Sequence, residues 1–336
     1  MIHAQKIIKR LLFICFIFTV VVLSSCVAVS GYAEPESQYI VSAMGFDVSG
    51  GRVEVSAEII DGGSERILSG VGSSIEQAIS ALLAQETKSL EVSHCAILVL
   101  GENADAEWIE KISGFCRRNE DITVAAQLVS ASNAKELLSI EGVNGYDLAS
   151  TVSKNHENAA FGAESRYYSV QNTRISENNV YALPHFTVND DEYELYGVQI
   201  FCFDVRAVLL NRAEAAYYMM ARGLFDRGLV PYDAPGLSGS VGVSDCKTEY
   251  KFIPNGDKLS VNIKCILTID SELGDDEYAQ EIARATGKGM LTLWEKLAWR
   301  YGDIFKLREN AALMGTDLDP SIISEASVSF ECIVKK

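Results

Sequence analysis

The cysteine at position 26 stands where the sequence best supports covalent chemistry, namely attachment of lipid to a thiol. Basic residues precede an apolar run from Leu11 to Leu23, which is followed directly by Ser24-Ser25-Cys26. A basic start, an apolar run shorter than the ~20 residues that span a bilayer, and small residues at its exit are typical of an export signal. Because Leu-Ser-Ser-Cys is a bacterial lipobox pattern, we expect residues 1–25 to be a lipoprotein signal peptide and Cys26 to carry the lipid.

The signal has a second exit point, which would give a different mature protein. Gly31-Tyr32-Ala33 also fits the small-x-small cleavage rule, and cleavage there would discard Cys26. We favour the lipobox because it follows the apolar run directly. Each buried CH₂ of an acyl chain contributes about 0.8 kcal/mol, so two or three chains would hold the protein on a membrane surface. Residues 26–38 then form a tether.

Histidines and loop motifs elsewhere suggest no catalytic, cofactor-binding or metal site. Beyond the signal the histidines are far apart in sequence, at His94, His156 and His185, and we interpret His94 as a structural residue that opens an apolar strand. Gly287-Lys288-Gly289 lacks the earlier glycine that a phosphate-binding loop requires. Ser238 and Ser240 lack the spacing of a nucleophile elbow and are predicted to lie in a flexible loop.

The acidic residues and the cysteines indicate neither a metal site nor a disulfide. The cluster Asp190-Asp191-Glu192 with Glu194 could hold calcium, but it lacks the glycine and spacing of an EF-hand loop, so a solvated turn is expected. The six cysteines after Cys26 show neither C-x-x-C pairs nor zinc-site spacing. A two-residue Asn255-Gly256 turn would set Cys246 opposite Cys265. The two cysteines would then occupy a backbone hydrogen-bonded pair of positions in the antiparallel ladder. The geometry of such a pair suits a disulfide poorly, so free thiols are predicted. The cysteines are Cys95, Cys116, Cys202, Cys246, Cys265 and Cys332.

Charge and length limit the classes of protein that this chain can belong to. The full chain has a net charge of −17, and removing three basic residues with the signal leaves a mature charge of −20. Such acidity argues against nucleic acid as a partner and against adsorption to anionic lipid by charge. The roughly 310 mature residues exceed what one core usually supports, so two or three domains are expected.

The first half of the mature chain alternates strands with helices. Strands are expected at 39–47 and 52–60 around a glycine turn, with one buried face, and further strands at 94–100 and 122–130. A capping box at Ser73 predicts a helix from Ile75 to about Lys88, Asn103 a helix through Arg118, and Asn133 a short helix ending near Ile140. This order indicates an α/β or α+β unit, and the pattern does not decide whether the strands are parallel.

The second half predicts a hairpin beneath a long helix. A helix is expected at 146–161, two strands within 195–210, and a helix at 214–222 whose Tyr217–Met220 segment is either core or a partner surface. Strands at 241–253 and 258–269 form the Asn-Gly hairpin, and a final strand covers 326–334. Residues 275–314 read as helical, with a kink or break at Gly287 and Gly289.

Together these elements predict an α+β fold of several domains, three in our interpretation, whose long C-terminal helix packs on an antiparallel sheet. We expect an N-terminal α+β domain at 39–142, a middle region at 143–235 and a C-terminal α+β domain at 236–336.

Short segments spread along the chain have an order that resembles one known family. The most specific, Ser93–Glu102, is similar to that family's Ser-His-x-x-x-(apolar)-Gly-Glu segment. Others, in chain order, are Met44–Asp47, Gly72–Ala78, Arg117–Glu120, Ala134–Leu138, Leu195–Phe201 leading through Val208 and Leu209 to Glu214, and Tyr301–Phe305. The family is Ger(x)C, the lipoprotein C subunits of spore germinant receptors. Val27-Ala28 departs from it, standing where the family has Trp-Asp after the lipidated cysteine.

The resemblance implies a three-domain α+β protein that is not an enzyme and holds no cofactor or metal. It would be anchored by the lipid on Cys26 to the outer face of the spore inner membrane or cell membrane. Its partners would be the multi-spanning A and B subunits of a germinant receptor, in nutrient-triggered spore germination.

Two other classes of protein are compatible with an exported lipoprotein. A solute-binding lipoprotein that feeds a transporter is the main alternative, although that class usually presents two similar lobes and the halves of this chain are unlike. A cell-wall hydrolase is more distant, because no acid–base or metal set can be recognised.

Overall fold

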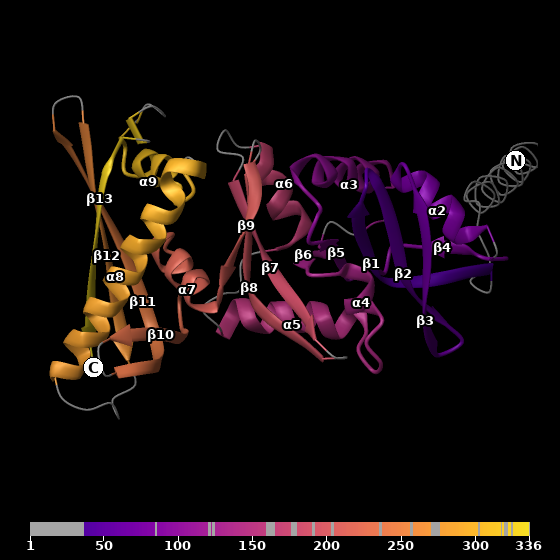
Figure 1. The fold of residues 1–336 in the computed structure, drawn as a ribbon, viewed down its shortest axis with the longest axis horizontal. Helices are drawn as coiled ribbons and strands as arrows, with labels where there is room; N and C mark the ends of the chain where they lie inside the picture. The colour runs from indigo at the N-terminus through magenta and orange to yellow at the C-terminus, as the bar shows by residue number, and fades with distance from the viewer. Residues whose placement is uncertain are drawn as a thin grey trace, which may run out of the picture.

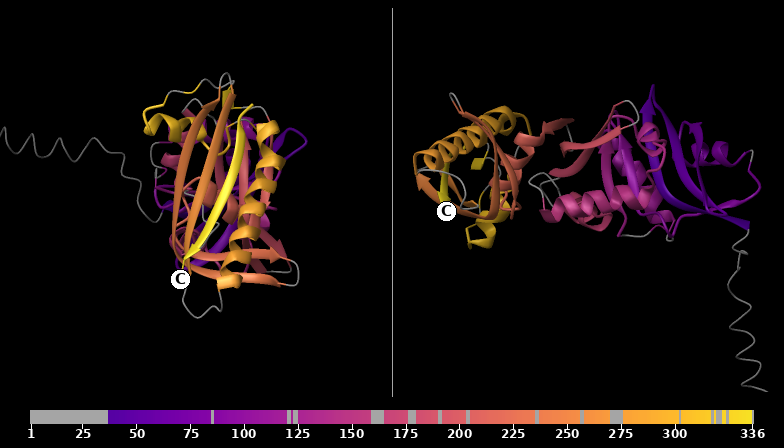
Figure 2. Two further views of the ribbon diagram at one scale, coloured as in Figure 1. Left: turned by 90° about the vertical axis from the view of Figure 1, so that its left-hand side faces the viewer. Right: turned by 90° about the horizontal axis from the view of Figure 1, so that it is seen from below.

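Two β-sheets joined by one buried helix organise the described part of the chain (Figure 1). The computed structural model describes residues 37–335 except 85, 120–121, 123–124, 159–164, 176–179, 190–191, 203–204, 235–236, 256–257, 270–275, 302, 317, 319–321 and 324. The signal, Cys26 and all but the end of the tether lie outside it. The larger sheet and the C-terminal sheet lie at opposite ends of the long axis (Figures 1 and 2).

The larger sheet contains nine strands among the described residues, in the order β3-β2-β1-β5-β6-β7-β8-β9, with β4 pairing beside β1. The neighbours β1, β5, β6 and β7 run parallel, whereas β1–β3 and β7–β9 are antiparallel meanders on either side. The sequence did not decide whether the strands run parallel, and the sheet contains both parallel and antiparallel pairs. The strands are β1 (Gln38–Ser49), β2 (Arg52–Asp61), β3 (Ser64–Gly72), β4 (Ser89–Glu91), β5 (Ile97–Gly101), β6 (Gln127–Ala131), β7 (Val180–Asn189), β8 (Glu192–Cys202) and β9 (Val205–Asn211).

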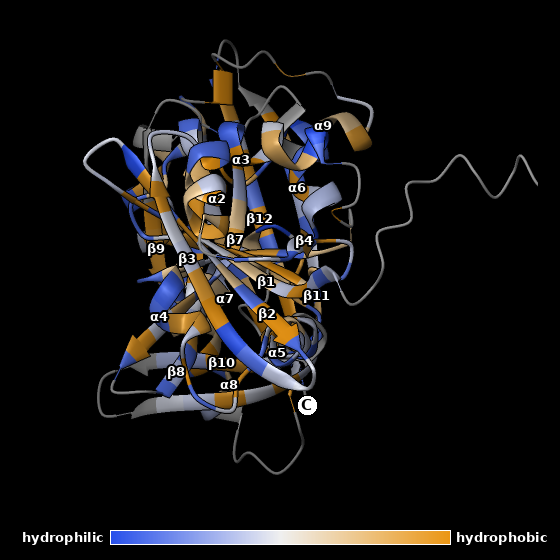
Figure 3. Ribbon diagram, turned by 90° about the vertical axis from the view of Figure 1, so that its right-hand side faces the viewer, coloured by the Kyte–Doolittle hydropathy of each residue, from blue (hydrophilic) through white to orange (hydrophobic). Residues whose placement is uncertain are grey.

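Helices cover both faces of this sheet. One face packs against α2 (Ile75–Leu83), α3 (Ala106–Arg118) and α6 (Tyr167–Ile175), and the other against α4 (Ala134–Leu138), α5 (Gly145–Asn158) and α7 (Arg212–Ala221). The central strands read as continuous apolar runs because both of their faces are buried. At the edge, β3 has a hydrophilic block followed by a hydrophobic one (Figure 3), and buried and exposed residues alternate from Leu68 to Gly72.

The C-terminal sheet has the order β10-β11-β12-β13. Helix α8 (Asp276–Tyr301) crosses one face, which confirms the long helix on a sheet, and α9 (Leu307–Leu313) follows. The first three strands are antiparallel, but β13 lies parallel to β12, unlike the antiparallel sheet that we expected. The helical crossover explains this, because it returns the chain to the end at which β12 began. The strands are β10 (Gly228–Ala234), β11 (Leu237–Asn255), β12 (Lys258–Ile269) and β13 (Ser327–Lys335).

Helix α7 lies between the two sheets. It contacts β8 and β9 on one side and β10, β11, β12 and α8 on the other, and every residue from Ala215 to Ala221 is buried. A helix that is apolar on all sides is stable only when it is enclosed. This settles the alternative for Tyr217–Met220 in favour of core.

The larger sheet contains strands from both sides of the boundary expected at residue 142, since β6 pairs with β7. Strand β10, which begins at Gly228, belongs to the C-terminal sheet although it precedes residue 236. The division into domains at those two positions stays a prediction.

Several helix and strand starts differ from the sequence-based expectation. The N-cap of α2 is Ser74 rather than Ser73, because the Ser73 hydroxyl donates to Gln77 Oε1 instead, and α2 ends at Leu83 rather than near Lys88. Asp105, not Asn103, caps α3 by accepting from Trp108 N at 3.1 Å. Asn133 caps α4 as expected. Strands β5 and β6 start later than expected, after turns in which Cys95 N donates to Val92 O and Ile122 N to Asn119 O.

Of the two hairpins expected at glycine turns, the first is confirmed and the second has a different turn and register. Gly50 and Gly51 adopt φ of +57° and +75°, as a tight turn between β1 and β2 requires. In the second hairpin Asn255 pairs with Lys258, so the loop is Gly256-Asp257, which lies outside the described residues. The turn thus moves by one residue and the register between the two strands by two, so Cys265 faces Thr248 rather than Cys246. A relative shift of two residues keeps every side chain on its face, so hydrophobic alternation could not detect it. The six described cysteines are free.

Helix α8 continues through Gly287 and Gly289 and ends at Tyr301, so a break at these glycines is wrong, while the alternative of a kink stays a prediction. Gly289 has a packing role: a Cβ there would stand 2.6 Å from Cζ of Tyr217, whereas one at Gly287 would meet nothing closer than 3.7 Å. The glycine at 289 lets α8 approach α7 closely.

These two glycines form a matched pair for mutation. Gly289→Ala should lower the free energy of unfolding by about 1–3 kcal/mol, because the added methyl overlaps the Tyr217 ring. Gly287→Ala should raise it by about 0.5–1 kcal/mol through helix propensity alone. Urea denaturation of both variants checks this, and equal effects of the two would contradict the packing role.

Candidate functional site

Asp47, at the end of β1, joins the larger sheet to the start of α4. Its carboxylate accepts from Ala134 N at 2.9 Å and from Lys135 N at 2.8 Å. A negative charge at a helix N-terminus is stabilised by the unpaired N–H groups there. Burial raises the pKa of Asp47, and the two backbone hydrogen bonds partly oppose that shift.

Two glycines make room for this contact. A Cβ on Gly101 would overlap Oδ1 of Asp47, and a Cβ on Gly45 would stand 3.1 Å from Cβ of Ala134. The family-like segments at 44–47, 93–102 and 134–138 therefore meet at one point of the fold.

Glu58 makes a second contact of the same kind, which the sequence did not predict. It accepts from Gly145 N at 2.7 Å, at the start of α5, and from the Ser42 hydroxyl. We expected one buried face for the β1–β2 hairpin, but Ser56 and Glu58 are buried too, because α4 and α5 cover the other face. Burial raises the pKa of Glu58. A glutamate between an alanine and an isoleucine carries no sequence signal of such a role.

Asp303 repeats the arrangement in the C-terminal part. Its two carboxylate oxygens accept from Leu307 N at 2.7 Å and Arg308 N at 2.9 Å, at the start of α9. The neighbouring Ile304 and Phe305 are fully buried, and burial raises the pKa of Asp303. Asp303, Ile304 and Phe305 therefore have a structural role, like Asp47.

Replacing Asp47 tests how much this junction contributes. Asp47→Asn should lower the free energy of unfolding by about 1–3 kcal/mol, because one backbone N–H loses its charged acceptor. The control is Glu54→Gln, which removes a partly exposed ion pair with Lys135 and should cost less than about 1 kcal/mol. Chemical denaturation at neutral pH compares them, and a smaller loss for Asp47→Asn than for Glu54→Gln would contradict the role.

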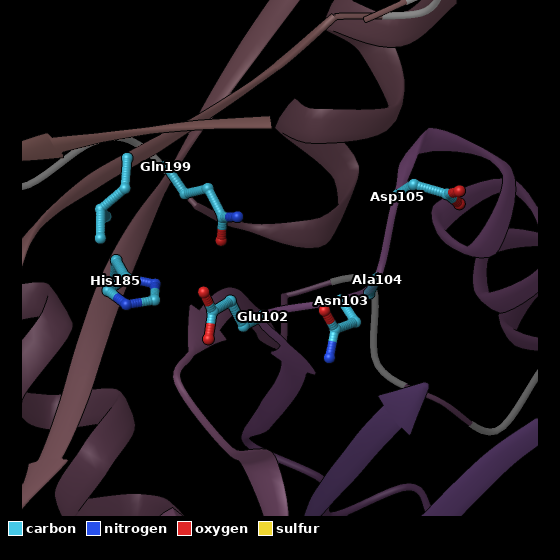
Figure 4. A pocket seen from close by; sticks show the side chains of 7 residues that line it. Glu102, Asn103, Ala104, Asp105, His185 and Gln199 are labelled. Carbon is cyan, nitrogen blue, oxygen red and sulfur yellow. The ribbon is translucent and has the colours of Figure 1, made fainter. Parts of the chain in front are cut away.

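A polar pocket opens at the carboxyl end of β5, beside β7, β8 and β9 (Figure 4). Its volume is about 430 Å³, and the segment Glu102–Asp105 forms one side. His185, Gln199 and Leu209 form the other, on one face of three adjacent strands, with Gln199 paired to Leu209 in register. Figure 4 shows the Glu102 carboxylate, the Gln199 amide and the His185 ring converging, while Asp105, the N-cap of α3, points away.

His185 is 2% exposed, and burial lowers its pKa to about 4, although the nearby Gln199 side chain partly opposes the shift. Its Nδ1 lies 3.0 Å from Ser130 Oγ, whose hydroxyl donates to the Pro184 carbonyl oxygen at 3.3 Å. At neutral pH the ring is therefore uncharged. Gln199 is 4% exposed, and although its side chain lies close enough to the His185 ring to influence that ring's pKa, its Oε1 has no partner with good hydrogen-bond geometry among the described residues.

The lowered pKa of His185 gives a signed pH dependence. The unfolded chain binds this proton at an ordinary pKa near 6.5, so its contribution to stability is lost as pH falls from about 6.5 towards 4, by about 3 kcal/mol at the lower end.

His185→Gln should remove that loss, so its free energy of unfolding falls less than that of the parent protein between pH 7 and pH 4.5. Denaturant titrations at both values measure the difference, with exposed His94→Gln as control. Identical pH dependence for His185→Gln and the parent would rule the interpretation out.

The other residues that the sequence singled out do not come together in one site within the described part of the chain. His94 is exposed in the turn before β5, so it does not open that strand as we expected. Asp190 and Asp191 lie outside the described residues, and Glu194 forms an ion pair with Arg212. The described residues contain no group of three metal-ligating side chains. Ser238 and Ser240 lie in β11, not in a loop.

Cys26 lies outside the described residues, and the cysteines within the fold are buried or half-buried. Burial raises the pKa of the Cys95 and Cys116 thiols to about 12, which keeps them protonated and unreactive at neutral pH. In the part that the structure covers, no helix has the length and apolarity to cross a membrane.

Comparisons with known proteins address the fold first. The crystal structure of the GerBC protein resembles this chain with a TM-score of 0.57 over 87% of this chain and 96% of that one, at 13% identity. At that identity the likeness shows the fold, a multi-domain α+β arrangement. No curated protein matches the chain.

The family follows from sequence. Residues 31–188 match the family model of the spore germination protein N-terminal domain, which includes the segments that meet around Asp47. Residues 31–188 thus carry the N-terminal domain of spore germination proteins, in agreement with the resemblance to the Ger(x)C family.

Proposed function

We propose that this chain is a non-enzymatic subunit of a spore germinant receptor, needed for nutrient-triggered germination. The observation that carries the proposal is the family match over residues 31–188. The subunit would work beside the A and B membrane subunits of the receptor, held to the outer face of the spore inner membrane or cell membrane by lipid on Cys26.

The buried acidic groups support a structural rather than a catalytic role. Asp47, Glu58 and Asp303 are each held against the start of a helix by backbone N–H groups. A carboxylate fixed in this way stabilises the junction between elements and is not free to exchange a proton with substrate. The acidic ionisable groups of the interior thus hold the elements in a fixed arrangement, as a module that docks on other proteins requires.

A lipid anchor would supply much of the association with membrane partners. Confining a protein to the membrane turns docking into an encounter at high effective concentration, so even a weak contact surface is sufficient. The mature charge of −20 makes attraction to anionic headgroups unfavourable, and the lipid would have to provide the attachment.

Substituting the anchor residue tests the attachment. Cys26→Ala should release the protein from the membrane fraction, because the acyl chains have no other thiol at the cleavage site. Ser25→Ala is the matched control: it exchanges one small residue for another, keeps Cys26 and should leave the protein membrane-bound. Fractionation and immunoblotting measure both, and retention of Cys26→Ala would contradict the lipid anchor.

Germination assays test the role itself. Spores that lack the gene should germinate slowly or not at all with nutrients, while growth and solute uptake stay normal, and restoring the gene should restore germination. Co-purification of the tagged protein with A and B subunits from spore membranes tests partner and location together. Normal germination with a lost uptake activity would favour the transporter lipoprotein instead.

A further inference from the structure

The pocket beside β7 and β8 contains an unmet hydrogen-bonding requirement. Gln199 Oε1 is buried and, although it lies near the His185 ring, has no partner with good hydrogen-bond geometry among the described residues; the amide points towards the space in front of Glu102 (Figure 4). A buried polar atom without a partner costs free energy, so native structures rarely keep one without a reason. A donor from a bound molecule would satisfy it.

The negative charge of the pocket lining indicates which kind of hydrogen-bond donor a ligand would carry. The Glu102 carboxylate has no ion-pair partner among the described residues, and no lysine or arginine stands in the described lining. His185 does not compensate this charge, because burial keeps the ring neutral. An N–H donor that also carries positive charge would serve both Gln199 Oε1 and Glu102.

The size and position of the pocket suit a small molecule. A volume of about 430 Å³ lies within the ~300–1,000 Å³ range of ligand pockets. The pocket lies at the carboxyl end of β5, a place where parallel sheets commonly bind ligands. Leu209, 40% exposed and opposite Gln199, offers an apolar wall for the body of the ligand.

We propose that this pocket binds a small organic cation through an N–H-bearing ammonium group, which donates to Gln199 Oε1 and lies beside the Glu102 carboxylate. The apolar part of the ligand packs against Leu209. This site is independent of the membrane anchor and of the proposed receptor role, which stand or fall on other measurements.

Calorimetric titration of the full chain in detergent tests the site with defined probes. 1,4-Diaminobutane should bind saturably at one site, whereas 1,4-butanediol, which lacks charge, and tetramethylammonium, which lacks N–H donors, should not bind. Calcium chloride is the fourth probe. The absence of binding by the diamine, or calcium binding in its place, would overturn the proposal.

Three variants locate the binding. Glu102→Gln should weaken the diamine about tenfold or more, as expected when a charged partner is lost. Gln199→Met should also weaken it while raising Tm, since the unpaired oxygen is replaced by an apolar group of similar shape. A purely structural residue would not move affinity and stability in opposite directions.

Asp105→Asn is the matched control for charge. It removes a negative charge from the same lining but keeps an N-cap for α3, and its side chain points away from the pocket (Figure 4). Its affinity should equal that of the parent. If the diamine bound the parent, Glu102→Gln and Gln199→Met equally, the binding would lie elsewhere on the acidic surface and the proposal would fail.

Discussion

Helix α7 is buried on all sides, and the arrangement of both sheets depends on that constraint. Its burial from Ala215 to Ala221 requires apolar partners on all sides, which the larger sheet supplies on one side and the C-terminal sheet with α8 on the other. The close approach at Gly289 completes the enclosure. The two sheets therefore share one continuous apolar core instead of meeting through a flexible linker.

Carboxylates fix the helices around that core. Asp47, Glu58 and Asp303 each satisfy backbone N–H groups that a helix start cannot pair within itself. Two of them lie in the segments by which the family is recognised. Family resemblance in this chain thus reports on the joints of the fold, while the pocket at Glu102 and Gln199 lies next to those joints without being needed by them.

Elements with a strong local signal could be predicted from sequence, such as the Gly50-Gly51 turn and the cap at Asn133. Others depend on contacts distant in sequence. Glu58 is buried only because α4 and α5 fold over it, the Cys246 register was off because a two-residue slip leaves hydrophobic alternation unchanged, and β13 is parallel because a helix intervenes. The pocket could not be predicted, since Glu102, His185 and Gln199 meet only in the folded sheet.

The long axis gives the proposed anchor a geometric meaning. The larger sheet begins with β1 at Gln38, at the end of the molecule opposite the C-terminal sheet (Figure 1). Ser37 lies eleven residues after Cys26 in the sequence, and a chain of that length reaches at most about 40 Å. A protein held at Cys26 would keep the start of β1 within that distance of the bilayer. The C-terminal sheet, joined rigidly through α7, would then swing with the larger sheet about the tether.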